Sequence, residues 1–169
     1  MHKNVVLPIL LILLASCGSP NWLHADADPT AILARGAGTW SGTYEMTVPF
    51  AATFTGESTA QWILDKKFLE TRSTMSNGDQ QLSLVNYNKE TGKYFFWQFK
   101  SDGSFPLGAT TGTWNEAQQE MTLAGEYPGG FRLEGSYTYA SADRFDIEMA
   151  IRGPAGKVVF QMTGSSTRK

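Results

Sequence analysis

Cysteine and histidine, which commonly serve as nucleophiles, general bases and zinc ligands, are few in this sequence and lie near its start. The one cysteine is Cys17, and the two histidines are His2 and His24. A Ser-His-acid triad needs a histidine, and zinc sites are normally built from cysteine and histidine. From residue 31 onward the sequence offers neither type, nor a histidine for haem. We therefore expect a non-enzymatic protein with no metal and no cofactor, and leave haem bound through a tyrosine as an open alternative.

Carboxylate pairs are the other route to acid–base chemistry. Glu134, Asp146 and Glu148 alternate with apolar residues and so fall on the solvated side of their strand-like runs. Glu70 and Arg72 differ, because their run is mixed in polarity. If they face inward, this pair orients the polar head of a ligand; if they face outward, it is an ordinary surface ion pair. Both alternatives stay open, as does an enzyme that works through inward-facing carboxylates.

The N-terminus has the layout of an export signal, with Lys3, an apolar run over residues 5–14 and small residues before Cys17. The run is shorter than the roughly 20 residues that a membrane-spanning helix needs. Leu-Ala-Ser-Cys at 14–17 resembles the lipobox of bacterial lipoproteins. The resemblance implies that residues 1–16 are a signal peptide that is removed, and that lipid on Cys17 then holds the protein on a membrane.

The residue after the cysteine bears on the destination of such a lipoprotein. It is Gly18 rather than an aspartate, so the inner-membrane retention signal of Gram-negative lipoproteins is absent. The expected location is the bacterial cell envelope, at the outer membrane or outer surface rather than the inner membrane.

The charge balance makes nucleic acid a poor partner. The whole chain has 14 Lys and Arg against 16 Asp and Glu, a formal charge of −2. Removal of 1–16 takes away only Lys3, so the mature chain is one unit more negative. Phosphate binding needs clustered basic residues, and the sequence has no basic run.

The segment after the cysteine reads as a tether over 17–30, followed by a folded domain over 31–169. Asp28-Pro29 is a helix-start signal, because aspartate caps and proline is tolerated in the first turn. Ile32 and Leu33 give this short helix an apolar side before Gly36 ends it. We expect the helix to lie over one end of the domain.

Beyond the helix the hydrophobic pattern has a period of two, which is typical of strands with one wet and one buried face. It is clearest around Trp40 to Val48, Phe131 to Tyr139 and Phe145 to Ile151. Less regular strand-like runs complete the pattern. They lie at 57–64, 67–75, 80–87, 93–99, 107–114, 119–126 and 157–166.

Short links with turn chemistry, such as Asn77-Gly78-Asp79 and Pro128-Gly129-Gly130, separate these runs. Links of this kind favour hairpins between strands that are neighbours in sequence. About ten strands joined by hairpins form an antiparallel up-and-down meander, and closure into a β-barrel removes its two exposed edges. The alternative is a β-sandwich.

Two sets of residues carry a resemblance. Gly38-Thr39-Trp40 on the first strand, with Arg168 at the far end, resembles the calycin pattern of lipocalins and fatty-acid-binding proteins, which implies that Arg168 packs on Trp40 and closes the barrel. The chain is also similar, over roughly 32–169, to a bacterial family numbered 1579 among the domains of unknown function. That similarity rests on 38–42, 67–70, Tyr87-Asn88 with 92–94, Trp97 with Asp102, 112–114 and Thr167-Arg168. It departs at Lys66-Lys67, where the family has Gly-Arg, and at Asn88, where it has Asp. It implies a calycin-like barrel without an assigned activity.

Aromatic side chains on phases expected to face inward are the positive functional signal. With the Glu70 and Arg72 pair they form the predicted ligand-binding set, whose aromatic members are Trp40, Tyr44, Trp62, Trp97, Trp114 and Tyr137. Apolar, aromatic-lined cavities with a few polar groups are the usual form of small-molecule sites. We predict a lipid-anchored barrel that binds a small hydrophobic or amphipathic molecule. The alternative is a structural or interaction lipoprotein with a solid core; the oligomeric state is left undetermined.

Overall fold

A computed structural model describes residues 28–103 and 108–169 of the chain. Its elements are one short helix and ten strands, in the order α1 then β1 to β10. Their bounds are α1 (Pro29–Ala34), β1 (Gly38–Val48), β2 (Ala52–Ile63), β3 (Phe68–Met75), β4 (Gln80–Asn88), β5 (Lys93–Lys100), β6 (Thr110–Asn115), β7 (Glu120–Tyr127), β8 (Phe131–Ser141), β9 (Arg144–Arg152) and β10 (Val158–Arg168). β2 begins at Ala52 rather than at 57, because small residues obscure its alternation.

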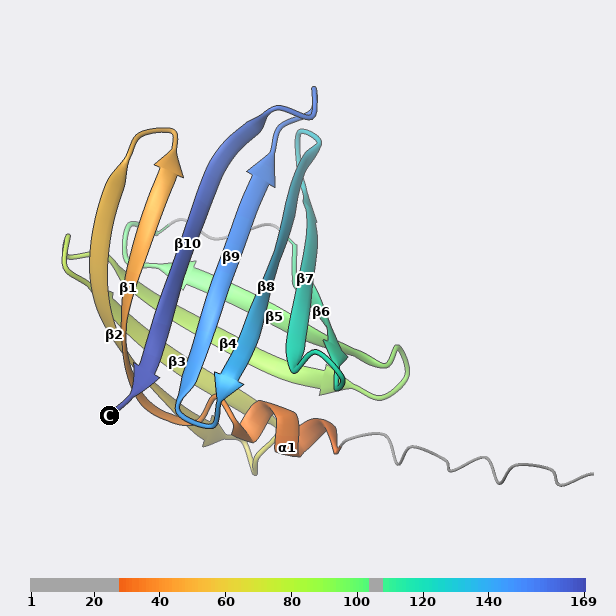
Figure 1. The fold of residues 1–169 in the computed structure, drawn as a ribbon. Coiled ribbons are helices and arrows are strands. Elements are labelled where there is room, and N and C mark those ends of the chain that lie inside the picture. The colour runs from red at the N-terminus through yellow and green to blue at the C-terminus, as the bar shows by residue number, and fades with distance from the viewer. Residues whose placement is uncertain (1–27, 104–107) are drawn as a thin grey trace, which may run out of the picture.

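The strands form one closed antiparallel barrel in which every strand pairs with its neighbours in sequence and β1 pairs with β10. The seam between first and last strands runs from Trp40 opposite Arg168 to Met46 opposite Met162. The predicted all-β, up-and-down barrel with a short N-terminal helix is therefore confirmed, and the sandwich alternative is wrong. In Figure 1, β1, β10, β9 and β8 run side by side, and β3, β4 and β5 cross behind them in another direction.

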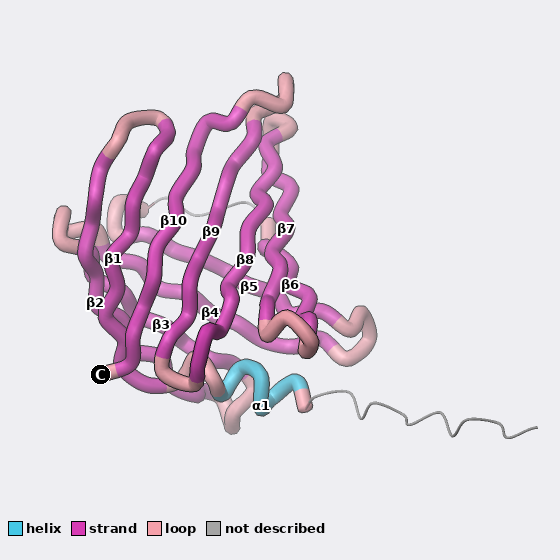
Figure 2. Tube along the Cα trace, in the orientation of Figure 1, coloured by secondary structure: helices cyan, strands magenta, loops and turns pink. Residues whose placement is uncertain are grey.

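The helix forms where the sequence predicts it. The Asp28 carboxylate accepts a hydrogen bond from the Thr30 backbone N–H at 3.0 Å, and Pro29 occupies the first turn. The helix starts at Pro29, as the Asp28-Pro29 signal predicts, and so overlaps the last two residues of the segment assigned to the tether. Ile32 and Leu33 are each 8% exposed because they point into the barrel at one end. Figure 2 shows α1 at that end, remote from the turns β1–β2 and β9–β10.

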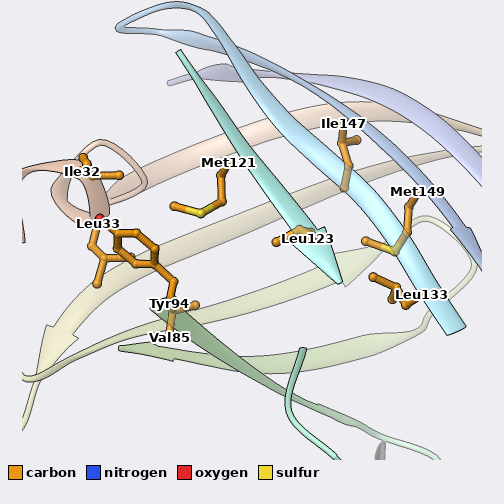
Figure 3. Packing of buried hydrophobic residues seen from close by; sticks show 9 residues of the cluster. All are labelled: Ile32, Leu33, Val85, Tyr94, Met121, Leu123, Leu133, Ile147 and Met149. Atoms are coloured by element: carbon orange, nitrogen blue, oxygen red, sulfur yellow. The ribbon is translucent and has the colours of Figure 1, made fainter. Parts of the chain in front are cut away.

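The strand register decides which side chains point inward, because residues paired across an antiparallel ladder share a face. Trp40 is buried and therefore points inward, and its partner Arg168 points inward with it. By the same rule Phe145, which lies opposite Ser166 of β10, and its partner Tyr139 also point inward at this end of the barrel. The buried core lies mainly on β7, β8 and β9, with α1 covering its end. Figure 3 shows its members, which are Ile32, Leu33, Val85, Tyr94, Met121, Leu123, Leu133, Ile147 and Met149.

Candidate functional site

The end of the barrel next to α1 is fastened by Arg168. Its guanidinium carbon lies 4.3 Å from the centroid of the Trp40 ring, and Trp40 is 2% exposed. The Arg168 Nε donates to the Asp143 carboxylate at 3.0 Å, and the indole N–H of Trp40 donates to the Gly36 carbonyl at 2.9 Å. The remaining guanidinium donors bond the backbone carbonyls of residues 35, 37 and 142. Four of the five N–H donors of Arg168 are thus engaged, and the cation is stacked on an aromatic face.

A second arginine seals the same end. The Arg35 guanidinium lies 4.5 Å from the Tyr139 ring centroid and 5.2 Å from that of Trp114. The Trp114 indole N–H donates to the Glu116 carboxylate at 2.6 Å. This bond, and a second from Gln119, lower the pKa of Glu116 because they favour its charged form. Rings and side chains therefore occupy this end of the barrel.

The inner face of β7, β8 and β9 is apolar and buried. Met121, Leu123, Leu133, Ile147 and Met149 are each 5–9% exposed. Their paired positions lie on one continuous face, because Met121 pairs through Tyr137 to Ile147 and Leu123 pairs through Gly135 to Met149. We call this surface the apolar wall; burial there raises the pKa of the Tyr137 phenol.

The inner face of β2, β3 and β4 is mixed, because it carries small polar side chains beside the buried Ala60, Leu69 and Val85. Ser58 pairs with Trp40 and with Ser73, and Thr71 pairs with Ala60 and with Ser83, so all of these side chains point inward. We call this surface, which consists of Ser58, Thr71, Ser73, Gln81 and Ser83, the polar wall. Its side chains are uncharged and keep intermediate exposure, although they lie inside a closed barrel. Partly accessible inward groups mean that protein does not fill the space beside them.

Two of the hollows formed by the described residues bear on ligand binding. One, of about 10 Å³, lies inside, which is close to the minimum for a single water. It is lined by Phe96, Gln98, Thr110, Leu123, Leu133, Tyr137 and Met149. The other, of about 520 Å³, lies on the outer surface of β1, β2, β3 and β10. Its lining is rich in hydroxyl groups, from Ser41, Thr43, Thr55, Thr74, Ser76, Ser165 and Thr167, with Glu57, Met75 and two glycines.

Five of the six predicted aromatic residues face the interior. Trp40 is buried, and four others pack against the core, namely Tyr44, Trp62, Trp114 and Tyr137. The Tyr44 hydroxyl lies 2.8 Å from the Ser166 hydroxyl, which is 1% exposed. The structure brings these rings to one interior, but Trp40 and Trp114 belong to its sealed end.

The orientation expected for Trp97 is wrong. Val85 is buried in the core and pairs with Phe96, so the adjacent Leu84 and Trp97, which pair with each other, point outward. β5 has apolar residues at consecutive positions, and a strand without alternation gives no sign of which side is inside. Phe95 and Phe99 lie two residues before and after Trp97 on the same strand, so they also point outward.

The same register resolves the Glu70 and Arg72 alternative. Glu70 pairs with Leu84 and Arg72 pairs with Leu82, so both point outward. Their ion pair has an N–O distance of 2.8 Å, and the Arg72 side chain is 68% exposed. The surface ion pair is therefore the observed arrangement, and the inward head-group role is wrong. Sequence reasoning missed the polar wall, because serine and threonine occupy both faces of β2 and β3.

Several predictions lie outside the described residues. These are the signal peptide at 1–16, the lipidated Cys17, most of the tether, His2 and His24. Within 28–103 and 108–169, no three His, Cys, Asp or Glu side chains lie close enough together to hold a metal ion. No helix in that part of the chain has the length and apolar character needed to cross a bilayer.

Comparison with known proteins agrees with this fold. The profile of a family described as protein of unknown function (DUF1579) matches residues 26–168, which confirms the family resemblance. The structure is similar to that of Rv2717c from M. tuberculosis, with 16% identity, coverage of 85% of this chain and 99% of that chain, and a TM-score of 0.65. It is also similar to an S-type phycobiliprotein lyase from Guillardia theta, with 12% identity, coverage of 82% and 91%, and a TM-score of 0.57. Among curated proteins, none matches this sequence closely enough to count as a relative.

Proposed function

We propose a function from the premise that this chain belongs to DUF1579, a family of proteins of unknown function: its barrel binds a small amphipathic molecule without transforming it. The observation that carries the proposal is the contrast between the two inner walls. The apolar wall, represented by Leu133 and Met149, is buried, whereas the polar wall, represented by Ser73 and Ser83, keeps partial exposure inside the barrel. A ligand with an apolar body and hydrogen-bonding groups complements both walls.

The buried part of this ligand is uncharged. Register places every Asp and Glu of the described strands on the outer face of the barrel. The inward-facing cations of those strands are Arg168, four of whose donors are engaged at the sealed end, and Lys100, which is exposed at the last position of β5. An interior without a free counter-charge disfavours a buried carboxylate or ammonium. The outward carboxylates also support the non-enzymatic hypothesis, since acid–base catalysis would need them inside.

The barrel is held at the bacterial cell envelope through lipid on Cys17. Eleven residues lie between Cys17 and Pro29, where α1 begins, so the tether spans at most about 40 Å. Gly18 favours the outer membrane or outer surface over the inner membrane. The ligand is then a molecule of the envelope or one that arrives from outside it.

Calorimetric titration with a matched pair of ligands tests the binding proposal. We expect a long-chain alcohol to bind, and the carboxylate of equal chain length to bind about tenfold more weakly or worse, because the carboxylate has no partner inside. Ser73→Leu fills the polar wall and should weaken binding. Thr74→Leu changes the next residue of β3, on the outer face, and should leave binding unchanged. If neither ligand binds, nor any small molecule extracted with the protein from its envelope, the proposal is wrong.

The lipid anchor has a separate test. Cells that express the full chain and are fed an alkyne-bearing fatty acid should label the protein, and Cys17→Ser should abolish both the label and membrane retention. A labelled Cys17→Ser protein would contradict the assignment of this cysteine.

A second function is favoured by the size of the interior hollow. A space of about 10 Å³ holds no more than a water, which favours a solid barrel that acts through its outer surface as a structural or interaction lipoprotein. The alcohol titration separates the two functions, because a solid barrel binds neither member of the ligand pair.

A further inference from the structure

The outer face of β3, β4 and β5 carries apolar side chains where a barrel facing water needs polar ones. We call this surface the outer aromatic patch. Its members are Phe68, Leu82, Leu84, Phe95, Trp97 and Phe99. We infer that this patch lies on the lipid surface to which the protein is anchored, so that the barrel rests on the membrane along one side. The inference relies on the proposed lipid anchor for the identity of the surface.

The patch is continuous across three strands. Leu84 pairs with Trp97 and Leu82 pairs with Phe99 on the outward side of the β4–β5 ladder. The Trp97 ring centroid lies 6.1 Å from that of Phe95, in a stacked arrangement, and 6.2 Å from that of Phe68 on β3. Phe99 is 40% exposed and the other members have intermediate exposure. In the described part of the chain, α1 lies at one end and no element covers this face (Figure 2).

Other outer faces of the same barrel show what a solvated wall looks like here. On β9 the outward positions include Asp146 and Glu148, and on β10 they include the exposed Thr163. Beside the patch, Glu70 and Arg72 form an ion pair, and Lys93 at the start of β5 adds one positive charge. An apolar surface with few charges is typical of a contact with a partner or a membrane.

The point where the chain enters the domain favours a membrane over a protein partner. The Tyr94 hydroxyl donates to the Pro29 carbonyl at 3.5 Å, so α1 begins at the end of the barrel where β5 starts. Tyr94 points inward, and the outward side of the same strand contributes three of the aromatic rings of the patch. A lipid attached within about 40 Å allows this face to reach the bilayer, and tryptophan and other aromatic rings are favoured at the membrane–water interface.

The test uses the full, lipidated chain in vesicles of phosphatidylethanolamine and phosphatidylglycerol. Cys17 is the only cysteine, and its thiol is consumed by the lipid, so one introduced cysteine carries a unique spin label. Leu82→Cys places the label in the patch. Thr163→Cys places it on the outer face of β10, across the barrel from β5. Collision with oxygen, which concentrates in lipid, is compared with collision with a water-soluble nickel complex.

We expect a several-fold higher oxygen-to-nickel collision ratio at position 82 than at position 163. Leu84→Cys repeats the measurement within the patch, should Leu82→Cys fail to fold. Equal water access at both positions in vesicle-bound protein would overturn the inference and leave the anchor intact. Spin–spin broadening at position 82 would identify a second copy as the occupant and would also overturn it. Failure of the protein to remain on the vesicles would make both the anchor and the inference wrong.

Discussion

The apolar wall and the polar wall face the same interior and belong to one hydrogen-bonded ring, but their side chains differ. β7 to β9 contribute buried methionine, leucine and isoleucine, whereas the serine, threonine and glutamine side chains of the polar wall keep partial exposure among the buried Ala60, Leu69 and Val85 of β2 to β4. Closure of the barrel depends on the backbone ladder, which passes through both walls. The difference shows that the polar wall contributes less side-chain burial than the apolar wall, and it is the part of the interior that we expect to contact a ligand.

Truncation of the apolar wall should have the largest effect. Leu133→Ala removes a buried side chain that is 5% exposed and leaves a cavity, which should lower the free energy of unfolding by about 2–5 kcal/mol. Ser73→Ala, on the polar wall, should change it by less than about 0.5 kcal/mol. Urea denaturation of both variants measures the contrast, and equal losses would show that the two walls contribute alike.

Changes at the seam, where β1 pairs with β10, should have the second largest effect on stability. Arg168→Met keeps an unbranched side chain over Trp40 but removes the charge-assisted hydrogen bonds to Asp143 and to the backbone. The expected loss of unfolding free energy is about 1.5–3 kcal/mol. Arg144→Met removes a surface ion pair with Asp146 and serves as the control. A loss no larger than that of the control would mean that the ladder alone closes the ring.

Alkaline pH should expose a smaller difference between the walls. Burial raises the pKa of Tyr137, on the apolar wall, above its ordinary value of 10.0. Because the unfolded chain then ionises before the folded one, the stability from the neutral phenol is complete below pH 10 and is lost as the pH rises above it. The slope for this residue is about 1.4 kcal/mol per pH unit. In Tyr137→Phe, the thermal-denaturation midpoint should fall less steeply with pH above pH 10 than in the unchanged protein. If it falls equally steeply, other ionisable groups cause the loss of stability.

The same contrast explains what the sequence could and could not predict. β9 was predictable because Phe145, Ile147 and Met149 alternate with charged residues, and alternation reports a difference between two faces. Which face of β5 points inward could not be predicted, because apolar residues occupy both of its faces. The polar wall was hidden for the opposite reason: Ser58 lies between polar neighbours and looks like any solvated position. Only the register of the closed ring shows which of these side chains point inward.

The position of α1 determines where a pull on the N-terminus acts. The chain reaches the barrel through a six-residue helix that contacts the core through two aliphatic side chains, Ile32 and Leu33, and through the hydrogen bond from Tyr94 to the Pro29 carbonyl. Each strand of the ring is instead held by ladders on both sides, of which the one between β5 and β6 is the shortest, with three paired positions. We therefore expect tension on the N-terminus to pull α1 away from the barrel before it separates the strands. Mechanical load would then act first on α1, and the closed sheet would stay intact.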